Sequence, residues 1–147
     1  MTTWKKFPLS EIASIGSGAG FPIADQGSEG EEFPFIKVSD MNLPSNERII
    51  QTWNNSVSEV VRHKLRATAF RAGSVIFPKI GAAIATNKKR ILTRPTCVDN
   101  NVMAVAANPE FLDEFGKLGS LYMQHILGCK NPRVALVNNG TEETKGT

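Results

Sequence analysis

Short apolar runs separated by turn residues dominate the chain between residues 33 and 107. Segments rich in aromatic and β-branched residues, bounded by Gly, Pro, Asn or Asp, are typical of β-strands. This pattern predicts strands at 33–38, 49–52, 74–80, 91–92, 96–98 and 101–107. Pro78 cannot donate a ladder hydrogen bond, so its strand is expected at an edge or a bulge. The small apolar residues 80–85 are expected to continue as a buried strand into an exposed basic tip, and the Gly-rich segment 16–22 is expected to be a loop.

Two segments have the spacing of helices. Ser56 with Glu59 three residues later forms a capping-box pattern, which predicts a helix start. The apolar residues expected on the buried face of this helix are Val57, Val60, Val61 and Leu65. Asn108 followed by Pro109 predicts a second helix, which should run to about Leu127 and end at Gly128. Its apolar stripe consists of Phe111, Phe115, Leu118, Tyr122 and Ile126.

Together these elements predict an α+β fold with a mixed, mostly antiparallel twisted sheet and a few flanking helices. The 147 residues suffice for one domain, expected over residues 1–128, and the polar residues 129–147 are expected to be a frayed tail. No apolar run approaches the roughly 20 residues of a membrane span, and no signal peptide is recognised. Cys97 and Cys129 suit neither a disulfide framework nor a zinc site, so a cytoplasmic location is expected.

The charge is distributed unevenly along the chain. The net charge is only +3, with 17 basic and 14 acidic residues. Between Val60 and Val98, however, there is no acidic residue. The basic residues of this segment are Arg62, Lys64, Arg66, Arg71, Lys79, Lys88, Lys89, Arg90 and Arg94. Such a block favours an anionic partner such as nucleic acid. The alternative is a solvated face to which folding brings acidic residues.

Motifs of catalysis are missing from the sequence. His63 and His125 carry no local catalytic signature, and neither cysteine has a C-x-x-C partner. The segment 16–22 fails the dinucleotide pattern because Phe21 stands where the third glycine belongs. A P-loop and a calcium-binding loop are also absent from the sequence. We therefore expect a non-enzymatic protein with no cofactor or metal of its own; a small hydrolase is the least favoured alternative.

Three stretches, Phe35–Met41, Phe77–Arg90 and Val98–Val102, resemble a target recognition domain of the DNA-specificity subunit of type I restriction-modification enzymes. The opening segment 4–12 also suits the start of such a subunit. The resemblance implies a recognition domain that reads half of a split target in double-stranded DNA. It also implies methyltransferase and restriction subunits as partners, with S-adenosylmethionine, ATP and Mg bound in those subunits.

The resemblance also implies which residues contact DNA. The basic tip Thr86–Arg90 is the best match to a DNA-contacting loop, with Lys79 before it. Lys88, Lys89 and Arg90 would bind phosphates, Arg90 alternatively a guanine edge, Asn87 an adenine edge and Thr86 a thymine methyl group. A charged hairpin tip is the structural alternative. Lys37, Ser39 and Asp40 form a second candidate surface, in which Asp40 could instead cap a turn, and Ser17 and Gly18 are weaker candidates.

One departure from that family is visible: the spacer helix and the second recognition domain are absent from this sequence, which suggests a truncated product or a fragment. A rival hypothesis follows from it. The chain would be a protein-interaction module or decoy half-subunit that docks a methyltransferase subunit, or its own copy, through the helix at 109–127.

Overall fold

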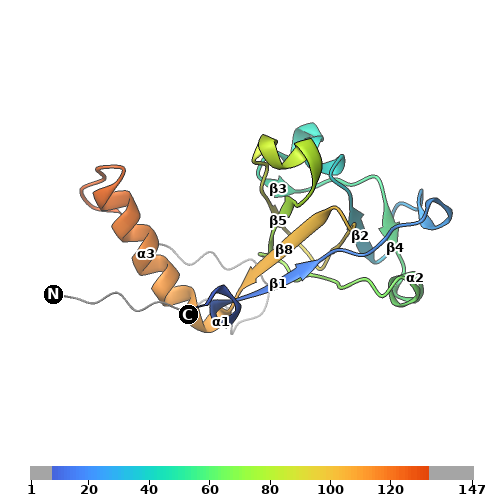
Figure 1. The fold of residues 1–147 in the computed structure, drawn as a ribbon, viewed down its shortest axis with the longest axis horizontal. Helices are drawn as coiled ribbons and strands as arrows, with labels where there is room; N and C mark the ends of the chain where they lie inside the picture. The colour runs from blue at the N-terminus through green and yellow to red at the C-terminus, as the bar shows by residue number, and fades with distance from the viewer. Residues whose placement is uncertain (1–7, 133–147) are drawn as a thin grey trace. The chain divides into compact units, whose positions relative to one another are not determined.

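The computed structural model describes residues 8–132, with the side chains of residues 110 and 112–114 left aside. The chain divides into two compact units, residues 1–107 and 108–147 (Figure 1). The predicted opening at residues 4–7 and most of the expected tail lie outside the described residues. The expected domain boundary at residue 128 stays a prediction.

A five-stranded sheet forms the centre of the first unit (Figure 1). Neighbouring strands are antiparallel except for the last pair, which is parallel. In spatial order the strands are β1 (Ala13–Ser17), β8 (Val102–Ala107), β5 (Val75–Pro78), β6 (Arg90–Leu92) and β3 (Ile49–Ile50). Along β8 the burial alternates strictly, as expected of a strand with one face in the core.

A smaller three-stranded sheet brings distant segments together. Its strands, in order, are β4 (Ser56–Val57), β2 (Phe33–Ile36) and β7 (Cys97–Val98). Strand β2 pairs antiparallel with β4 and parallel with β7, where Phe35 lies opposite Cys97. The α+β class with mixed, mostly antiparallel sheets is thus confirmed.

Two hydrophobic clusters hold these sheets in place. The larger one gathers Ile36, Met41, Ile76 and Val102 with four more buried side chains. The smaller one surrounds Phe35, whose ring stacks on Phe21 at a centroid distance of 3.8 Å. Both clusters draw residues from β2 and β7, so the parallel pair joins the two halves of the core.

Short helices connect the strands. The chain enters through α1 (Leu9–Ile12), and three 3₁₀ turns follow at η1 (Ile23–Asp25), η2 (Asp40–Asn42) and η3 (Pro44–Asn46). A six-residue helix, α2 (Glu59–Lys64), follows β4.

The predicted start of α2 is wrong by two residues. Ser58, not Ser56, is the N-cap, and its hydroxyl accepts a hydrogen bond from the Val61 N–H at 3.4 Å. The Ser56 hydroxyl is buried in β4, where it accepts a hydrogen bond from the Glu31 N–H. The predicted buried face is confirmed for Val57, Val61 and Leu65, which belong to or pack against the smaller cluster, and wrong for Val60, which is 78% exposed.

Two further expectations about strands are corrected. Strand β5 lies inside the sheet between β8 and β6, and Pro78 is tolerated there because it is the last residue of the strand. Residues 81–86 are not a buried strand but a 3₁₀ helix, η4 (Gly81–Thr86), with Ile84 54% exposed. The predicted loop at residues 16–22 begins later, because Gly16 and Ser17 belong to β1.

The second unit contains the predicted second helix. A 3₁₀ turn, η5 (Pro109–Phe111), precedes α3 (Leu112–His125), and Gly128 ends this region with a positive φ of 68°. Along its described part, α3 leaves large apolar side chains exposed, including Leu118 at 56% and Tyr122 at 54%. The periodicity therefore predicted the helix, and the apolar stripe along it is exposed at Leu118, Tyr122 and Ile126.

Candidate functional site

Folding brings together the two groups of residues singled out by the sequence. The tip that follows η4 lies against η2, because Lys88 Nζ donates to Asn42 Oδ1 and Arg90 Nη2 donates to the Met41 carbonyl at 2.8 Å. Lys37 and Ser39 immediately precede η2 in the sequence. Asn87 ends η4 in the left-handed conformation with φ 51°. The segments 37–39 and 86–90 thus adjoin a common turn.

The remaining predicted candidates lie in contacts of their own. Lys79 Nζ donates to Ser17 Oγ at 2.5 Å, and Lys37 Nζ donates to Gln26 Oε1 at 3.0 Å. Thr86 Oγ1 donates to the Ala83 carbonyl within η4. Gly18 has a packing role, since a Cβ there would overlap the carbonyl oxygens of Val98 and Asp99. The assignment of these residues to a site stays a prediction.

Two carboxylates close to these candidate residues, Asp40 and Asp99, are buried. Asp40 accepts hydrogen bonds from the Lys37 N–H at 2.7 Å and from Asn54 Nδ2 at 2.6 Å, so it fixes the turn after β2. Asp99 accepts from the Asn101 N–H at 2.9 Å, and burial raises the pKa of its carboxyl group. Asp99 is bound within its own turn, and Asp40 links its turn to Asn54 after β3, so both carboxylates have structural roles.

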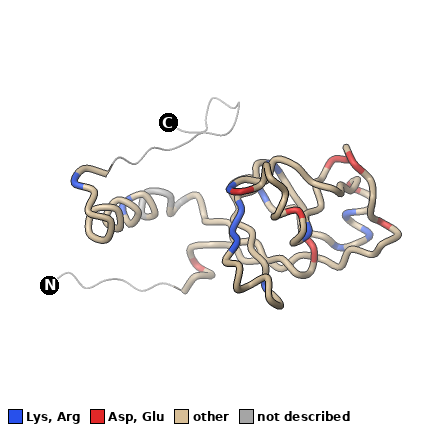
Figure 2. Tube along the Cα trace, turned by 90° about the horizontal axis from the view of Figure 1, so that it is seen from above, with Lys and Arg blue, Asp and Glu red and all other residues tan. Residues whose placement is uncertain are grey.

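The basic block does not form an uncompensated ledge. Arg62 pairs with Glu59 at 2.5 Å, and Lys64 pairs with Asp25 at 2.7 Å. Arg94 donates to the Glu32 carbonyl and lies over the Trp53 ring. In Figure 2 the Lys and Arg positions are spread over several segments of the first unit, and Asp and Glu positions lie on other segments among them. Folding thus neutralises part of the block, as in the alternative derived from sequence.

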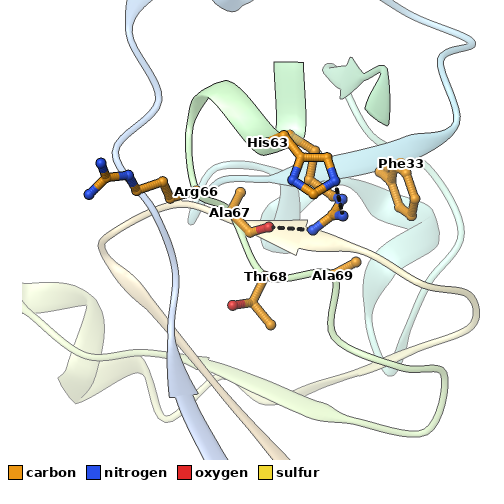
Figure 3. A pocket seen from close by; sticks show the side chains of 7 residues that line it. Phe33, His63, Arg66, Ala67, Thr68 and Ala69 are labelled. Carbon is orange, nitrogen blue, oxygen red and sulfur yellow. Dashed lines mark hydrogen bonds between the residues drawn. The ribbon is translucent and has the colours of Figure 1, made fainter. Parts of the chain in front are cut away.

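A cavity of about 590 Å³ opens beside the C-terminal end of α2. Figure 3 shows the side chains around it, which are Phe33, Arg62, His63, Arg66, Ala67, Thr68 and Ala69. Helix α2 ends here in a Schellman motif: the Ala67 N–H donates to the Arg62 carbonyl, and the Arg66 N–H donates to the His63 carbonyl, each at 3.0 Å. This motif holds Arg66 in the left-handed conformation with φ 52°.

Arg62 is fully engaged in the wall of this cavity. Its guanidinium binds both carboxylate oxygens of Glu59, donates to the Ala67 carbonyl at 3.0 Å and lies 5.4 Å from the centroid of the Phe33 ring. The Arg62 hydrogen bonds lower the pKa of Glu59 to about 2. His63 Nε2 lies 3.0 Å from Glu59 as well. The Arg66 side chain, by contrast, has no hydrogen-bond or ion-pair partner among the described residues.

A second cavity of about 420 Å³ shares a wall with the first. Thr68 and Ala69 line both cavities. The other lining residues of the second cavity come mostly from β1 and the segment before β5; they are Ser14, Ile15, Gly16, Phe70, Arg71 and Ala106. Arg71 donates to the Ala107 carbonyl at its rim.

Sequence reasoning missed this site. Arg62 and Arg66 counted only as members of the basic block, and His63 as a solvated residue. Residues 66–69 follow the last apolar position of α2 and precede the next strand, and a non-glycine residue at a helix end gives no signal in the sequence. Only the backbone conformation of the folded chain shows that Arg66 ends this helix in the left-handed region.

The described residues contain neither a metal-binding cluster nor a membrane-spanning helix. Between residues 8 and 132, no three His, Cys, Asp or Glu side chains are grouped so that they could hold a metal ion. Within the same range, no helix is long and apolar enough to span a membrane.

The C-terminal half of the chain matches a known sequence family. Residues 73–147 match the sequence family described as fatty acid synthesis protein. Because this match spans just over half of the 147 residues, the chain belongs to that family.

Curated proteins named phosphate acyltransferase agree with this assignment. The one from Dehalococcoides mccartyi is 40% identical over 70 residues, which are 48% of this chain and 19% of that protein. The one from Streptococcus suis is 51% identical over 51 residues, 32% of this chain and 15% of that protein. A third, from Fusobacterium nucleatum, is 58% identical over 40 residues, 27% of this chain and 12% of that protein. The chain thus matches less than a fifth of the length of each.

Solved structures resemble the fold. An HsdS subunit from Thermoanaerobacter tengcongensis superposes with a TM-score of 0.50 at 17% identity, covering 86% of this chain and 29% of that one. A chain from a study of the assembly of the type I R-M system gives a TM-score of 0.52 at 18% identity, covering 86% and 30%. At such identity the likeness concerns the fold alone, and it agrees with the fold that the resemblance implied.

The functional expectations from that resemblance are wrong. The family match and the acyltransferase relatives overturn the assignment to a type I specificity subunit and to a restriction system. They also overturn sequence-specific DNA binding, the alternative of a decoy half-subunit, and double-stranded DNA, methyltransferase and restriction subunits as partners. Because the relatives are named as enzymes, the expected non-catalytic role is corrected too. The quoted stretches form strands and turns, so they reported the fold rather than the function.

Proposed function

We propose that this chain takes part in the transfer of an acyl group to phosphate. The observation that carries the proposal is the family match over residues 73–147, together with relatives of 40–58% identity that are named phosphate acyltransferase. The matched segment includes β5, β6, β7, β8 and the whole of α3.

In such a transfer, phosphate replaces the leaving group of an activated acyl donor. An oxygen of phosphate attacks the carbonyl carbon of an activated acyl donor, the bond from that carbon to the leaving group breaks, and the leaving group departs with the electron pair. Phosphate can itself be the nucleophile, so no protein Ser or Cys has to be acylated. The protein supplies cationic groups and N–H donors for the phosphate and the developing oxyanion. The missing nucleophile motif therefore does not oppose this reaction class.

The exposed apolar side chains of α3 support a role within a larger packed fold. Within α3, Leu118, Leu121, Tyr122 and Met123 are all exposed apolar residues, at 39–56%. A helix that is apolar over so much of its surface is normally buried on several sides. The relatives are more than five times longer than the matched segments, so activity of this chain by itself is the point that the assay has to test.

We place the protein in the cytoplasm within this proposal. Both cysteines are free, Cys97 being buried and Cys129 half-buried. Free thiols are the usual state in a reducing compartment.

The test is an assay of the full chain with a long-chain acyl thioester and inorganic phosphate. Acyl phosphate is trapped with hydroxylamine, and thiol release is followed in parallel. We expect product that depends on protein, thioester and phosphate together. If the chain shows a native far-UV spectrum and forms no acyl phosphate over the reaction without protein, the proposal is wrong.

A variant pair links the activity to the matched segment. The double substitution Leu118→Asp and Tyr122→Asp changes two exposed positions of α3, so the first unit should fold unchanged. We expect at least a tenfold loss of acyl transfer. The control is Ile23→Asp in η1, which is 88% exposed and lies outside the matched segment; it should keep the activity. Equal activity of both variants would contradict a role for α3.

A further inference from the structure

Strand β1 forms one end of the five-stranded sheet (Figure 1). The other strands that end a sheet in the described part of the chain, β3, β4 and β7, have two residues each, whereas β1 has five. Native proteins usually protect a long edge with charged residues, proline or a bulge. Strand β1 contains no charged residue and no proline, and its register with β8 is continuous. It is therefore an edge to which another strand can be added.

The register of β1 with β8 determines which backbone groups this edge offers. In antiparallel strands, residues that exchange hydrogen bonds with the partner alternate with residues whose N–H and C=O point to the other side. The Gly18 N–H donates to the Val102 carbonyl at 3.0 Å, so Gly16 also bonds to β8. The N–H and C=O groups of Ile15 and Ser17 consequently point away from β8, and no backbone group of the described residues is bonded to them.

A cavity lies directly beside this edge. The second cavity, of about 420 Å³, is lined by Ser14 to Gly16 of β1, by Ala106 of β8 and by the segment 68–71. A Cβ built on Gly16 would lie 2.6 Å from the Phe70 ring, so the cavity is on the face of β1 to which Gly16 belongs. In a strand added to β1, alternate side chains point to this face. The cavity therefore lies where one of these side chains would be placed.

The walls of this cavity favour a large apolar side chain. Ala69, Phe70 and Ala106 provide apolar surface, and none of the lining residues is acidic. The volume is sufficient for the side chain of leucine or phenylalanine. When a peptide adds a strand to a sheet edge, main-chain hydrogen bonds give affinity and pockets for alternate side chains give specificity. Strand β1 and the cavity provide both parts of such a site.

The charges near the edge are cationic and lie outside the cavity. Lys79 Nζ donates to Ser17 Oγ at 2.5 Å. Ser17 lies opposite Met103, on the half-buried face of the sheet that is turned away from Gly16. The Arg71 guanidinium is held at the rim of the cavity by a backbone carbonyl. A neutral segment therefore suits this edge better than a basic one.

A second copy of this chain would leave the cavity unfilled. Antiparallel pairing of two β1 strands about Ile15 would place Ser14 and Gly16 of the second copy on the cavity side, and both residues are small. Two strands of five residues also form a contact far smaller than the roughly 1,200 Å² that stable complexes bury. The cavity instead fits a different polypeptide with a larger side chain at this position.

We propose that β1 binds an extended, uncharged peptide segment of a partner protein as an additional antiparallel strand. The N–H and C=O groups of Ile15 and Ser17 bind the peptide backbone. One large apolar side chain of the peptide, opposite Gly16, occupies the cavity between β1 and the segment 68–71. Apart from Ala106, the residues of this site precede residue 73, so it lies outside the family match and is independent of the proposed acyl transfer. Peptide binding is measured without an acyl donor, so the two proposals can fail separately.

The test uses the isotope-labelled full chain and the neutral peptide acetyl-Ser-Thr-Val-Leu-Val-Thr-Ser-amide. Titration followed by NMR gives the affinity, and amide hydrogen exchange at saturation reports on single residues. We expect saturable binding that slows exchange of the Ile15 and Ser17 amides at least tenfold. Absence of binding at millimolar peptide, or binding that leaves both amides unprotected, overturns the proposal.

Two N-methylated peptides test the backbone pairing in the unmodified chain. With the leucine opposite Gly16, the two valines lie opposite Ile15 and Ser17 and donate to β1, whereas the leucine N–H points to solvent. Methylation of the leucine nitrogen should therefore leave the affinity unchanged. Methylation of both valine nitrogens should weaken binding at least tenfold. Equal affinity of the two peptides, or the reverse order, contradicts the proposed antiparallel pairing.

A substitution pair tests the same contact from the side of the protein. Ile15→Pro removes an N–H that β8 does not use, and proline is tolerated in an edge strand whose N–H faces solvent. We expect at least tenfold weaker peptide binding with little change in melting temperature. Ile15→Thr keeps the N–H and a β-branched side chain, and it should bind as the unmodified chain does. Equal binding by a folded Ile15→Pro variant overturns the assignment of the edge.

A second pair tests the cavity. Ser14→Leu fills the cavity from an exposed position of β1 and should weaken peptide binding at least tenfold. Ser28→Leu, at an exposed position outside both cavities, is the matched control and should bind normally. Unchanged binding by Ser14→Leu would show that the apolar side chain lies elsewhere and overturn this half of the proposal.

Sedimentation equilibrium tests the rival occupant, a second copy of this chain. We expect the unmodified chain to be a monomer at the concentrations of the titration. A dimer that is lost in Ile15→Pro, together with absence of peptide binding, would assign the edge of β1 to self-association and overturn the proposal.

Discussion

The two units of this chain differ in how they treat their apolar residues. In the first, short strands with only two to six residues bury Phe35, Ile76 and Val102 completely. In the second, a helix of 14 residues leaves Leu118 and Tyr122 more than half exposed, and so is Ile126, the residue after it. A segment with regular apolar periodicity thus forms a helix whose apolar side chains stay exposed. Apolar residues of short strands with weak local patterns are buried completely once those strands pair with distant ones. Burial therefore measures which part of the chain has its packing partners.

The largest expected effect is the contrast between core and helix truncations. Phe35→Ala removes a side chain that is 0% exposed and stacks on Phe21, so we expect a loss of about 3–5 kcal/mol in the free energy of unfolding. Tyr122→Ala removes an aromatic side chain that is 54% exposed, and its cost should be below about 1 kcal/mol. Urea unfolding followed by circular dichroism measures both. Similar losses would show that α3 is packed in solution.

The next effect concerns a close approach between two segments of the first unit. Gly18→Ala would force a Cβ against the carbonyl oxygens of Val98 and Asp99, which belong to the backbone and cannot rotate away. We expect a destabilisation of about 2–3 kcal/mol, as for overpacked cores. Gly20→Ala is the matched control, because nothing lies within 4 Å of its Cβ position. Thermal unfolding compares the two, and equal stability would mean that the turn relaxes freely.

The two thiols should differ in reactivity. Burial raises the pKa of Cys97 to about 11 from an ordinary 9.0. This shift reduces the thiolate at a given pH by about a hundredfold, and burial blocks access as well. Cys129, half-buried in the second unit, should therefore be alkylated by iodoacetamide long before Cys97. Mass spectrometry of the native and the urea-unfolded chain checks the order, and early labelling of Cys97 would show that the first unit opens.

The smallest effect belongs to the exposed ion pair at α2. The Glu59 pKa is lowered from 4.5 to about 2, chiefly by its hydrogen bonds with Arg62. A carboxyl group with a lowered pKa stabilises the folded state above its unfolded value and loses that contribution as the pH falls toward the folded value. Stability should thus decrease between pH 4.5 and 2, and Glu59→Gln should make this decrease smaller. Melting temperatures across this range test it; identical slopes would assign the acid sensitivity to other carboxylates.

Local sequence patterns gave the elements but not their neighbours. The strands β2, β6, β7 and β8 and the helix α3 lie within or close to the predicted segments, because turn residues and periodicity act over a few residues. The parallel pairs β2–β7 and β3–β6 join residues more than 40 positions apart, and no local pattern specifies them. Pairing between distant strands also explains why Ser58 and not Ser56 is the N-cap of α2. Ser56 pairs with Pro34 of β2 and is therefore part of the sheet.

The candidate site was predictable only in part. The basic tip 86–90 and the segment 37–39 were identified by charge and turn residues, and their proximity at η2 came from the fold. The cavity beside α2 had no signal in the sequence, because the left-handed conformation of Arg66 is visible only in the backbone and Phe33 lies about 30 positions before the other lining residues, 62–69. The resemblance to specificity subunits predicted the fold correctly and the function incorrectly, since strand and turn motifs describe architecture.

By itself, the sequence determined where strands, turns and the long helix form, how charge is spread along the chain, and that classical nucleophile motifs are missing. These properties depend on neighbouring residues, whose interactions do not require the rest of the molecule. The tertiary structure alone decided the order of the strands, which bases are neutralised, where Arg66 points and which apolar side chains stay exposed. Those outcomes depend on contacts between distant segments, whose free energy is defined only when the whole chain is packed.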